Sequence, residues 1–150
     1  MTLEQDIGLL ARTRPFDLLP RDALKIVAFA AERKRIAAGE SLFNQGDEAD
    51  CAYFVLSGAV LLSIYGQAGP KEHVAGPGAL IGEIAMIAPV TRPSSAHARD
   101  DTVALRIPRD VMTRVLAEFP REAALIRASF AKRTKQMVAE LSVLRNQAMV

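Results

Sequence analysis

A glycine-rich loop runs directly into a short segment whose residues favour a helical turn. The loop begins at Gly76, and residues 82–87, starting with Gly82, predict one turn of helix. Free backbone amides at the start of a helical turn attract anions, above all phosphate. If the fold brings Arg92 back over this turn, its guanidinium offers phosphate two parallel donors. These residues together predict a phosphate site.

Glu83 is a carboxylate next to that predicted anion site. It is explained if it accepts a hydrogen bond from a sugar hydroxyl of the same ligand, which would make the ligand a nucleotide. Taken singly, each residue has a structural explanation. Gly82 suits a turn, Glu83 suits the start of a helix, and Arg92 suits the surface. The joint spacing is what indicates a binding site.

A second glycine-bearing stretch precedes this loop in the chain. Gly39 and Gly46 fall where turns need a positive φ, and Asp47 and Asp50 can hydrogen-bond to the local backbone. The apolar run at 53–56 predicts a core strand. A calcium loop is not supported, because further oxygen ligands at a suitable spacing are missing.

The elements that must position these residues follow from hydrophobic periodicity. Residues 3–12 and 20–31 predict helices, and the second carries an apolar stripe for docking. Short β-favouring runs separated by turns predict an antiparallel sandwich or barrel up to residue 108. The pattern is helical again after that point. The predicted fold class is therefore α+β: a jelly-roll-like antiparallel β-roll (a double-stranded β-helix) flanked by N-terminal helices and a long C-terminal helix.

The chain of 150 residues has room for one domain, which we divide at 1–32, 33–108 and 109–150. Nineteen basic against seventeen acidic residues leave a charge of +2, too small to indicate nucleic acid or a membrane surface. The single cysteine, Cys51, excludes an intramolecular disulfide framework. The uncharged stretch 51–70 is divided by glycines and does not predict a membrane span. We expect a cytoplasmic protein without a secretory signal.

Both glycine-bearing stretches, in this order and spacing, resemble the cyclic nucleotide-binding domain shared by the bacterial catabolite activator, the regulatory subunits of cyclic-AMP-dependent kinase and cyclic-nucleotide-gated channels. The resemblance runs from about Phe16 to about Pro120. It implies that Gly82 and the amides of Ile84 and Ala85 meet the cyclic phosphate. The implied ligand-binding residues are Ile81, Gly82, Glu83, Ile84, Ala85, Arg92, Pro93, Ser94, Ser95 and His73.

Three of these residues have more specific implied roles. The resemblance places Glu83 on the ribose 2′-hydroxyl, Arg92 on the phosphate charge and His73 near the base. The sequence departs from the family after the arginine, where Pro93 replaces a residue with a backbone N–H. Losing a hydrogen bond to a charged partner costs about 1.5 to 3 kcal/mol unless Ser94 or Ser95 replaces it.

The C-terminal helix carries two further features. Phe130, Met137 and Leu144 recur every seven residues, with Leu141 between them, and predict either a homodimer seam or a helix that folds back. Lys132, Arg133 and Lys135 form a small basic patch, interpreted as a solvated helix face with nucleic-acid contact as the alternative. The family's transcription factors carry a linked DNA-binding domain after this helix, and we expect none here.

Catalysis is not expected. A metal site of the jelly-roll enzymes needs about three histidines, and the chain has only His73 and His97. Cys51 precedes a core strand and is expected to be a buried small hydrophobe. We therefore predict a sensor that binds cAMP, with cGMP as the alternative ligand, without cofactor or metal, and signals through its flanking helices to an effector that the sequence does not identify. The alternative is a degenerate fold that binds no ligand and acts as a dimerisation or protein-interaction module.

Overall fold

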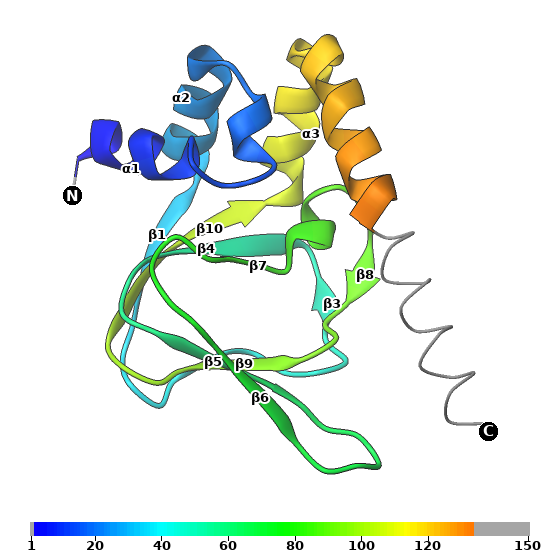
Figure 1. Ribbon diagram of the computed structural model, residues 1–150. Helices are drawn as coiled ribbons and strands as arrows, with labels where there is room; N and C mark the ends of the chain where they lie inside the picture. The colour runs from blue at the N-terminus through cyan, green and yellow to red at the C-terminus, as the bar shows by residue number, and fades with distance from the viewer. Residues whose placement is uncertain (1, 134–150) are drawn as a thin grey trace, which may run out of the picture.

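The computed structural model describes residues 2–133, in which a layer of helices covers one side of a β-roll (Figure 1). The helices are α1 (Leu3–Leu10), the 3-10 turn η1 (Phe16–Leu18), α2 (Arg21–Ala30), α3 (Arg109–Glu118) and a further helix that covers residues 120–133. A 3-10 turn, η2 (Glu83–Met86), lies within the roll. Among the described helices, none combines the length and apolar character needed to cross a membrane.

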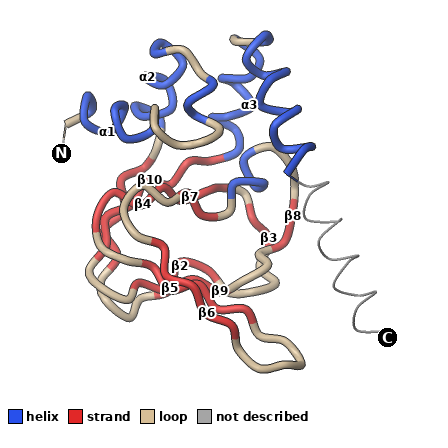
Figure 2. Tube along the Cα trace, viewed as in Figure 1, coloured by secondary structure: helices blue, strands red, loops and turns tan. Residues whose placement is uncertain are grey.

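Antiparallel strands form the roll, as the sequence predicts (Figure 2). One sheet has the order β1-β10-β4-β7, the other has the order β2-β9-β5-β6, and β3 pairs with β8. The bounds are β1 (Glu32–Ile36), β2 (Ser41–Phe43), β3 (Glu48–Ala49), β4 (Cys51–Ser57), β5 (Val60–Ile64), β6 (Lys71–Ala75), β7 (Leu80–Ile81), β8 (Val90–Thr91), β9 (Ser95–Ala98) and β10 (Thr102–Pro108).

Successive side chains of β4 point to opposite faces of the sheet and so join two different apolar clusters. Phe54 faces the helices and joins the main core, whereas Val55 faces the interior of the roll. On α2, Leu24, Val27 and Ala28 are buried in the main core. The docking stripe predicted for this helix is therefore confirmed.

Prolines mark three helix starts. Pro20 and Pro108 occupy the N-cap positions of α2 and α3, with φ of −69° and −67°, and Pro120 is the first residue of the next helix. Proline is tolerated there because its missing N–H would have no partner in the first turn. The predicted break at Phe119-Pro120 is confirmed, since α3 ends at Glu118 and a new helix begins two residues later.

The Gly58→Ala change is expected to destabilise the fold more than a glycine-to-alanine change in an open turn. Gly58 joins β4 to β5 at φ +87°, and a Cβ there would lie 2.4 Å from the backbone oxygen of Asp101. The left-handed backbone costs an alanine about 1–2 kcal/mol, and the backbone clash adds about 1–3 kcal/mol. Gly39→Ala is the control, because φ is +90° and the space around it is open. Denaturant unfolding that gave equal losses for the two variants would contradict this packing.

Candidate functional site

The predicted helical turn after the glycine-rich loop is present as η2. Gly82 precedes it with φ +72° and ψ 39°, a left-handed conformation that suits glycine. The Ala85 amide donates to the Gly82 carbonyl at 3.1 Å and so closes the turn. The amides of Glu83 and Ile84 precede this first bond of the turn. Of the two amides implied to meet a phosphate, that of Ala85 is thus bonded within the turn, whereas that of Ile84 comes before its first bond.

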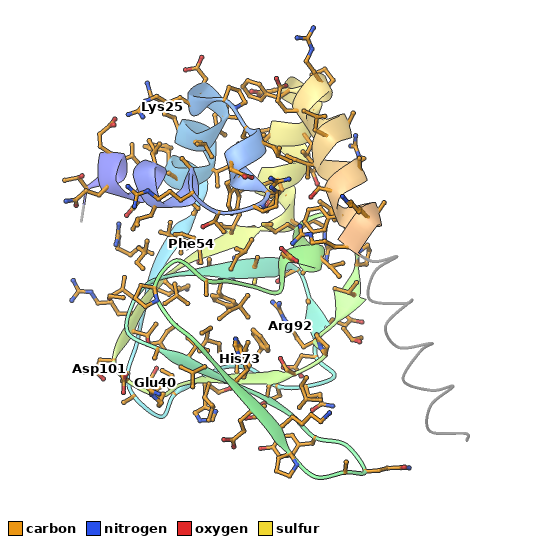
Figure 3. The ribbon with its side chains drawn as sticks, viewed as in Figure 1. Lys25, Glu40, Phe54, His73, Arg92 and Asp101 are labelled. Atoms are coloured by element: carbon orange, nitrogen blue, oxygen red, sulfur yellow. The ribbon has the colours of Figure 1, made fainter. Side chains whose placement is uncertain are left out.

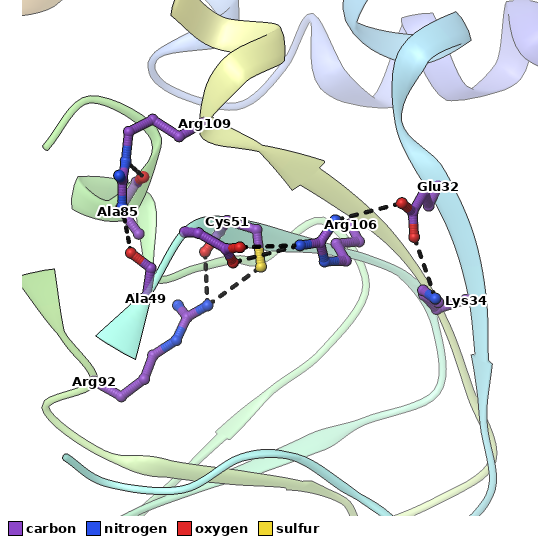
Figure 4. Close-up of polar contacts among 9 residues, drawn as sticks. Glu32, Lys34, Ala49, Cys51, Ala85, Arg92, Arg106 and Arg109 are labelled. Carbon is purple, nitrogen blue, oxygen red and sulfur yellow. Dashed lines mark hydrogen bonds and ion pairs between the residues drawn. The ribbon is translucent and has the colours of Figure 1, made fainter. Parts of the chain in front are cut away.

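Arg92 lies inside the roll, with only 5% of its surface exposed. Figure 3 places it between the two main sheets, on the side of β3 and β8. Its Nη2 donates to the carbonyl oxygen of Cys51 at 2.8 Å and to its Sγ at 3.3 Å (Figure 4). The guanidinium carbon lies 4.2 Å from the centre of the Phe43 ring and 5.9 Å from that of Tyr53. The side chain is therefore fixed on one edge and on one face.

The other edge of the guanidinium faces Gly82. A Cβ on Gly82 would lie 2.3 Å from Arg92 Nη1, so only glycine leaves room for this approach. Nη1 is buried and has no hydrogen-bond partner among the described residues. Buried donors are almost always bonded, and burying a cation without a partner is costly. An unpaired guanidinium edge against a glycine-led turn is the arrangement that an anionic ligand would complete.

Arg92 is held by three residues that the sequence motifs did not indicate as site residues: Phe43, Cys51 and Tyr53. Cys51 is buried, as expected, but its thiol and carbonyl both contact the arginine. Burial raises the pKa of the Tyr53 phenol above its ordinary value, and the neighbouring Cys51 acts in the same direction. The phenol therefore stays neutral at physiological pH. Cys51 and Tyr53 are two residues apart in β4, and this spacing indicates that both side chains lie on the same face.

Glu83 is paired with an arginine of the C-terminal helix. Glu83 Oε1 and Arg133 Nη1 are 2.5 Å apart, and about a third of each side chain is exposed (30% and 34%). The Arg133 guanidinium also lies 4.7 Å from the centre of the Phe130 ring. Its Nε and Nη2 are buried without a partner in the described part of the chain. The interpretation as a solvated helix face is therefore wrong for Arg133. Lys132 is exposed, and Lys135 lies outside the described residues.

The comparison with protein-family models agrees with this geometry. The model of the cyclic nucleotide-binding domain matches residues 33–119, which is more than half of the chain. This chain belongs to the cyclic nucleotide-binding domain family.

Solved structures of cyclic nucleotide-binding proteins share the fold. The cyclic nucleotide-binding-like protein of Brucella abortus is 38% identical, with a TM-score of 0.69 over 75% of this chain and 98% of that chain. The catabolite activator protein of Thermus thermophilus is 27% identical, with a TM-score of 0.72 over 91% and 62%. The regulatory domain of Toxoplasma gondii PKA, solved with cAMP, is 26% identical, with a TM-score of 0.71 over 75% and 44%.

Curated relatives include much longer proteins. Lysophospholipase nte1 of Aspergillus terreus is 33% identical over 123 residues, which are 81% of this chain and 8% of that protein. Lysophospholipase nte1 of Aspergillus fumigatus is 34% identical over 124 residues, with the same two shares of 81% and 8%. This chain therefore corresponds to one short segment of those proteins.

The residues after Arg92 alternate in burial. Pro93 is exposed and Ser94 is 8% exposed, so Arg92 and Ser94 both lie on the inner side of the chain. Ser95 Oγ accepts a hydrogen bond from the Gln45 amide at 2.8 Å. Ser94 is thus the better placed of the two serines to face the interior of this cyclic nucleotide-binding domain.

The other implied ligand-binding residues lie on three different elements, namely β7, η2 and β6. Ile81 ends β7 and is buried, whereas Ile84 is 38% exposed. His73 is exposed on β6, opposite Leu62 of β5. Leu62 packs against the cluster inside the roll, so His73 lies on the inner face of its strand.

The predicted dimer seam needs a correction at its first residue. Phe130 is 5% exposed and belongs to the main core of its own chain, together with Ile126 and Ala123. The helix therefore folds back over the described part of its length, and Phe130 packs within its own chain. The other seam residues, Met137, Leu141 and Leu144, lie outside the described residues.

Proposed function

We propose that this chain is a cyclic nucleotide sensor that binds cAMP or cGMP beside Gly82 and Arg92 and signals through its flanking helices. The observation that carries the proposal is the buried Arg92 Nη1, which has no described hydrogen-bond partner and faces Gly82. It is a binding function, with no catalytic step assigned to any residue.

A cyclic phosphodiester fits this arrangement by charge. It carries one negative charge, which pairs with the guanidinium in surroundings shielded from water, where such hydrogen bonds are short and strong. The absent side chain at Gly82 leaves the space that Arg92 Nη1 occupies, so the guanidinium lies directly against the turn. Cys51 and the Phe43 ring hold the arginine in position before the ligand arrives, which lowers the entropic cost of binding.

Glu83 supports a nucleotide rather than a free phosphate. Its carboxylate lies one residue after Gly82, and as a pure acceptor it suits the ribose 2′-hydroxyl. In the structure the same carboxylate is paired with Arg133. A ligand that engages Glu83 would therefore act on the contact that ties residues 120–133 to the turn η2. A ligand shifts the position of a helix when it binds one arrangement of that helix more tightly than the other.

Pro93 favours a second candidate, a domain with a degenerate pocket that acts only in protein interaction. Thermal denaturation separates the two functions. A ligand at 100 times its Kd stabilises a protein by about 2.7 kcal/mol, so the sensor should melt at a higher temperature with excess cAMP or cGMP. An unchanged melting temperature with both nucleotides at millimolar concentration would support the interaction module.

Glu83→Gln is expected to weaken cAMP binding about tenfold, because a neutral amide is a poorer acceptor for the ribose hydroxyl than a carboxylate. Calorimetry should compare cAMP with 2′-deoxy-cAMP, which lacks that hydroxyl. The loss should be confined to cAMP, so that the ratio of the two affinities falls by the same factor. Glu40→Gln, an exposed carboxylate on the loop before β2, is the control. An equal loss for both ligands in Glu83→Gln would contradict the ribose contact.

A further inference from the structure

The side chain of Gln45 binds both polar backbone groups of Tyr65. The Tyr65 amide donates to Gln45 Oε1 at 2.9 Å, and Gln45 Nε2 donates to the Tyr65 carbonyl at 3.3 Å. A primary amide presents an acceptor and a donor side by side, as the backbone of a neighbouring strand does. Gln45 therefore continues the sheet with its side chain, one residue beyond Ile64, where β5 ends.

The tip of the hairpin formed by β5 and β6 (residues 64–71) extends beyond its neighbouring strand, β9. Pairing of β5 with β9 ends at Ser63 and Ser95, and the hairpin continues past this point (Figure 1). Ile64 is 48% exposed and Tyr65 is 62% exposed. Within residues 2–133, the two bonds of Gln45 are the hydrogen bonds that join this tip to another part of the chain. Because a two-stranded hairpin is marginally stable by itself in water, Gln45 limits how far the tip opens.

The other end of the hairpin is anchored by apolar packing. Ala75 of β6 is buried inside the roll in the cluster that contains Phe43. The Phe43 ring lies against the Arg92 guanidinium. Leu62 of β5 packs against the same cluster, and His73 of β6 is paired opposite Leu62. The inner face of the hairpin therefore forms one wall of the interior that holds Arg92.

Gln45 also belongs to the turn that fixes the backbone of Arg92. The Gly46 amide donates to the Arg92 carbonyl at 2.8 Å, and the Arg92 amide donates to the Asp47 carbonyl at 2.7 Å. The turn covers residues 44–47 and is closed by a bond from the Asp47 amide to the Asn44 carbonyl at 3.1 Å. The hairpin tip and the residue that carries the unpaired guanidinium edge are thus attached to one turn.

We propose that Gln45 is a positioning residue that holds the β5–β6 hairpin against this turn and thereby slows the release of a nucleotide bound at Arg92. The inference rests on the proposed function, since it needs a ligand at Arg92. The side chain of Gln45 is exposed and bonds to Tyr65, not to Arg92, so its loss should leave the capture of the nucleotide by the guanidinium unchanged. Loss of a closing contact acts on the dissociation rate, where most affinity differences between related complexes arise.

The test uses the full chain with Gln45→Ala, which removes both bonds to Tyr65 and keeps the backbone of the turn. Gln67→Ala is the matched control, because Gln67 is an exposed glutamine of the same hairpin tip whose side chain makes no hydrogen bond within residues 2–133. Surface plasmon resonance with cAMP, and with cGMP, gives the association and dissociation rate constants. Gln45→Ala should release the nucleotide about five- to tenfold faster, with an association rate constant within about twofold of the parent value. Gln67→Ala should match the parent in both.

Hydrogen exchange of the Tyr65 amide tests the contact in the absence of nucleotide. This amide should exchange slowly in the parent protein and in Gln67→Ala, because it donates to Gln45, and faster in Gln45→Ala. An equal exchange rate in the parent protein and Gln45→Ala would contradict the closing contact.

Each outcome decides a separate claim. If the parent protein does not bind cAMP or cGMP, the proposed function fails and this inference fails with it. If the parent binds but Gln45→Ala releases the nucleotide at the parent rate, or if the change lies in the association rate constant, only the role of Gln45 is overturned. Should Gln45→Ala not fold, exchange of the Tyr65 amide in the parent protein replaces it. cAMP should slow that exchange, and an unchanged rate would overturn the proposal.

Discussion

Replacing Arg92 with alanine is expected to raise the Kd for cAMP at least about 100-fold. The guanidinium is the buried cation against Gly82, and two charge-assisted hydrogen bonds to a phosphate contribute about 1.5–3 kcal/mol each. Arg92→Lys should recover only part of the affinity, because an ammonium cannot bond to Cys51 and present a second donor in one plane. Calorimetric titration of both variants measures these effects.

The stability of Arg92→Ala separates binding from folding. The side chain is 5% exposed, and its Nη1 has no described partner, so the ligand-free protein bears the cost of a buried cation. We expect the melting temperature of Arg92→Ala without ligand to stay near that of the parent or to rise. Arg99→Ala, an exposed arginine next to Asp100, is the control for loss of a positive charge. If Arg92→Ala bound cAMP as tightly as the parent protein does, Arg92 would not be part of the binding site.

Gly82→Ala is expected to have the second largest effect, because it disturbs backbone and ligand site together. The added Cβ would lie 2.3 Å from Arg92 Nη1, and the residue has φ +72°. The guanidinium must move out of its position, so cAMP affinity should fall at least about tenfold, and backbone strain should cost about 1–2 kcal/mol of stability. Calorimetry and denaturant unfolding measure the two effects.

Gly78→Ala is the matched control for this change. Gly78 precedes β7, whereas Gly82 follows it, and Gly78 has φ +88° with open space around the position of a Cβ. It should show the strain without the contact to Arg92, so stability falls by a similar amount and affinity stays within about twofold. If both variants lost affinity equally, the loop conformation and not the Gly82–Arg92 contact would govern binding.

Local signals in the sequence predicted the framework of the site well. The left-handed φ of Gly82 and the turn η2 follow from the glycine-rich loop, and the strand of residues 51–57 follows from an apolar run. The helix starts are marked by prolines that fit only the first turn. In each case the residue type itself restricts the backbone.

These local signals did not predict contacts between residues that are far apart in the sequence. Cys51 lies 41 positions before Arg92, and Arg133 lies 50 positions after Glu83, so no short spacing links either pair. Arg133 has the sequence environment of a solvated patch, and only the packing of the helix over the core at Phe130 brings it to Glu83 in η2. Arg109 is similar, because it donates hydrogen bonds to the backbone carbonyls of Ala49, Asp50 and Ala85, and backbone acceptors have no signature in the side-chain sequence.

The most direct test of the central claim is calorimetric titration of the full chain with cAMP and with cGMP. The unpaired edge of Arg92 beside Gly82 predicts saturable binding of at least one of them, with one site per chain and a Kd that is micromolar or tighter. Absence of binding heat with both nucleotides at millimolar concentration, together with an unchanged melting temperature, would contradict it.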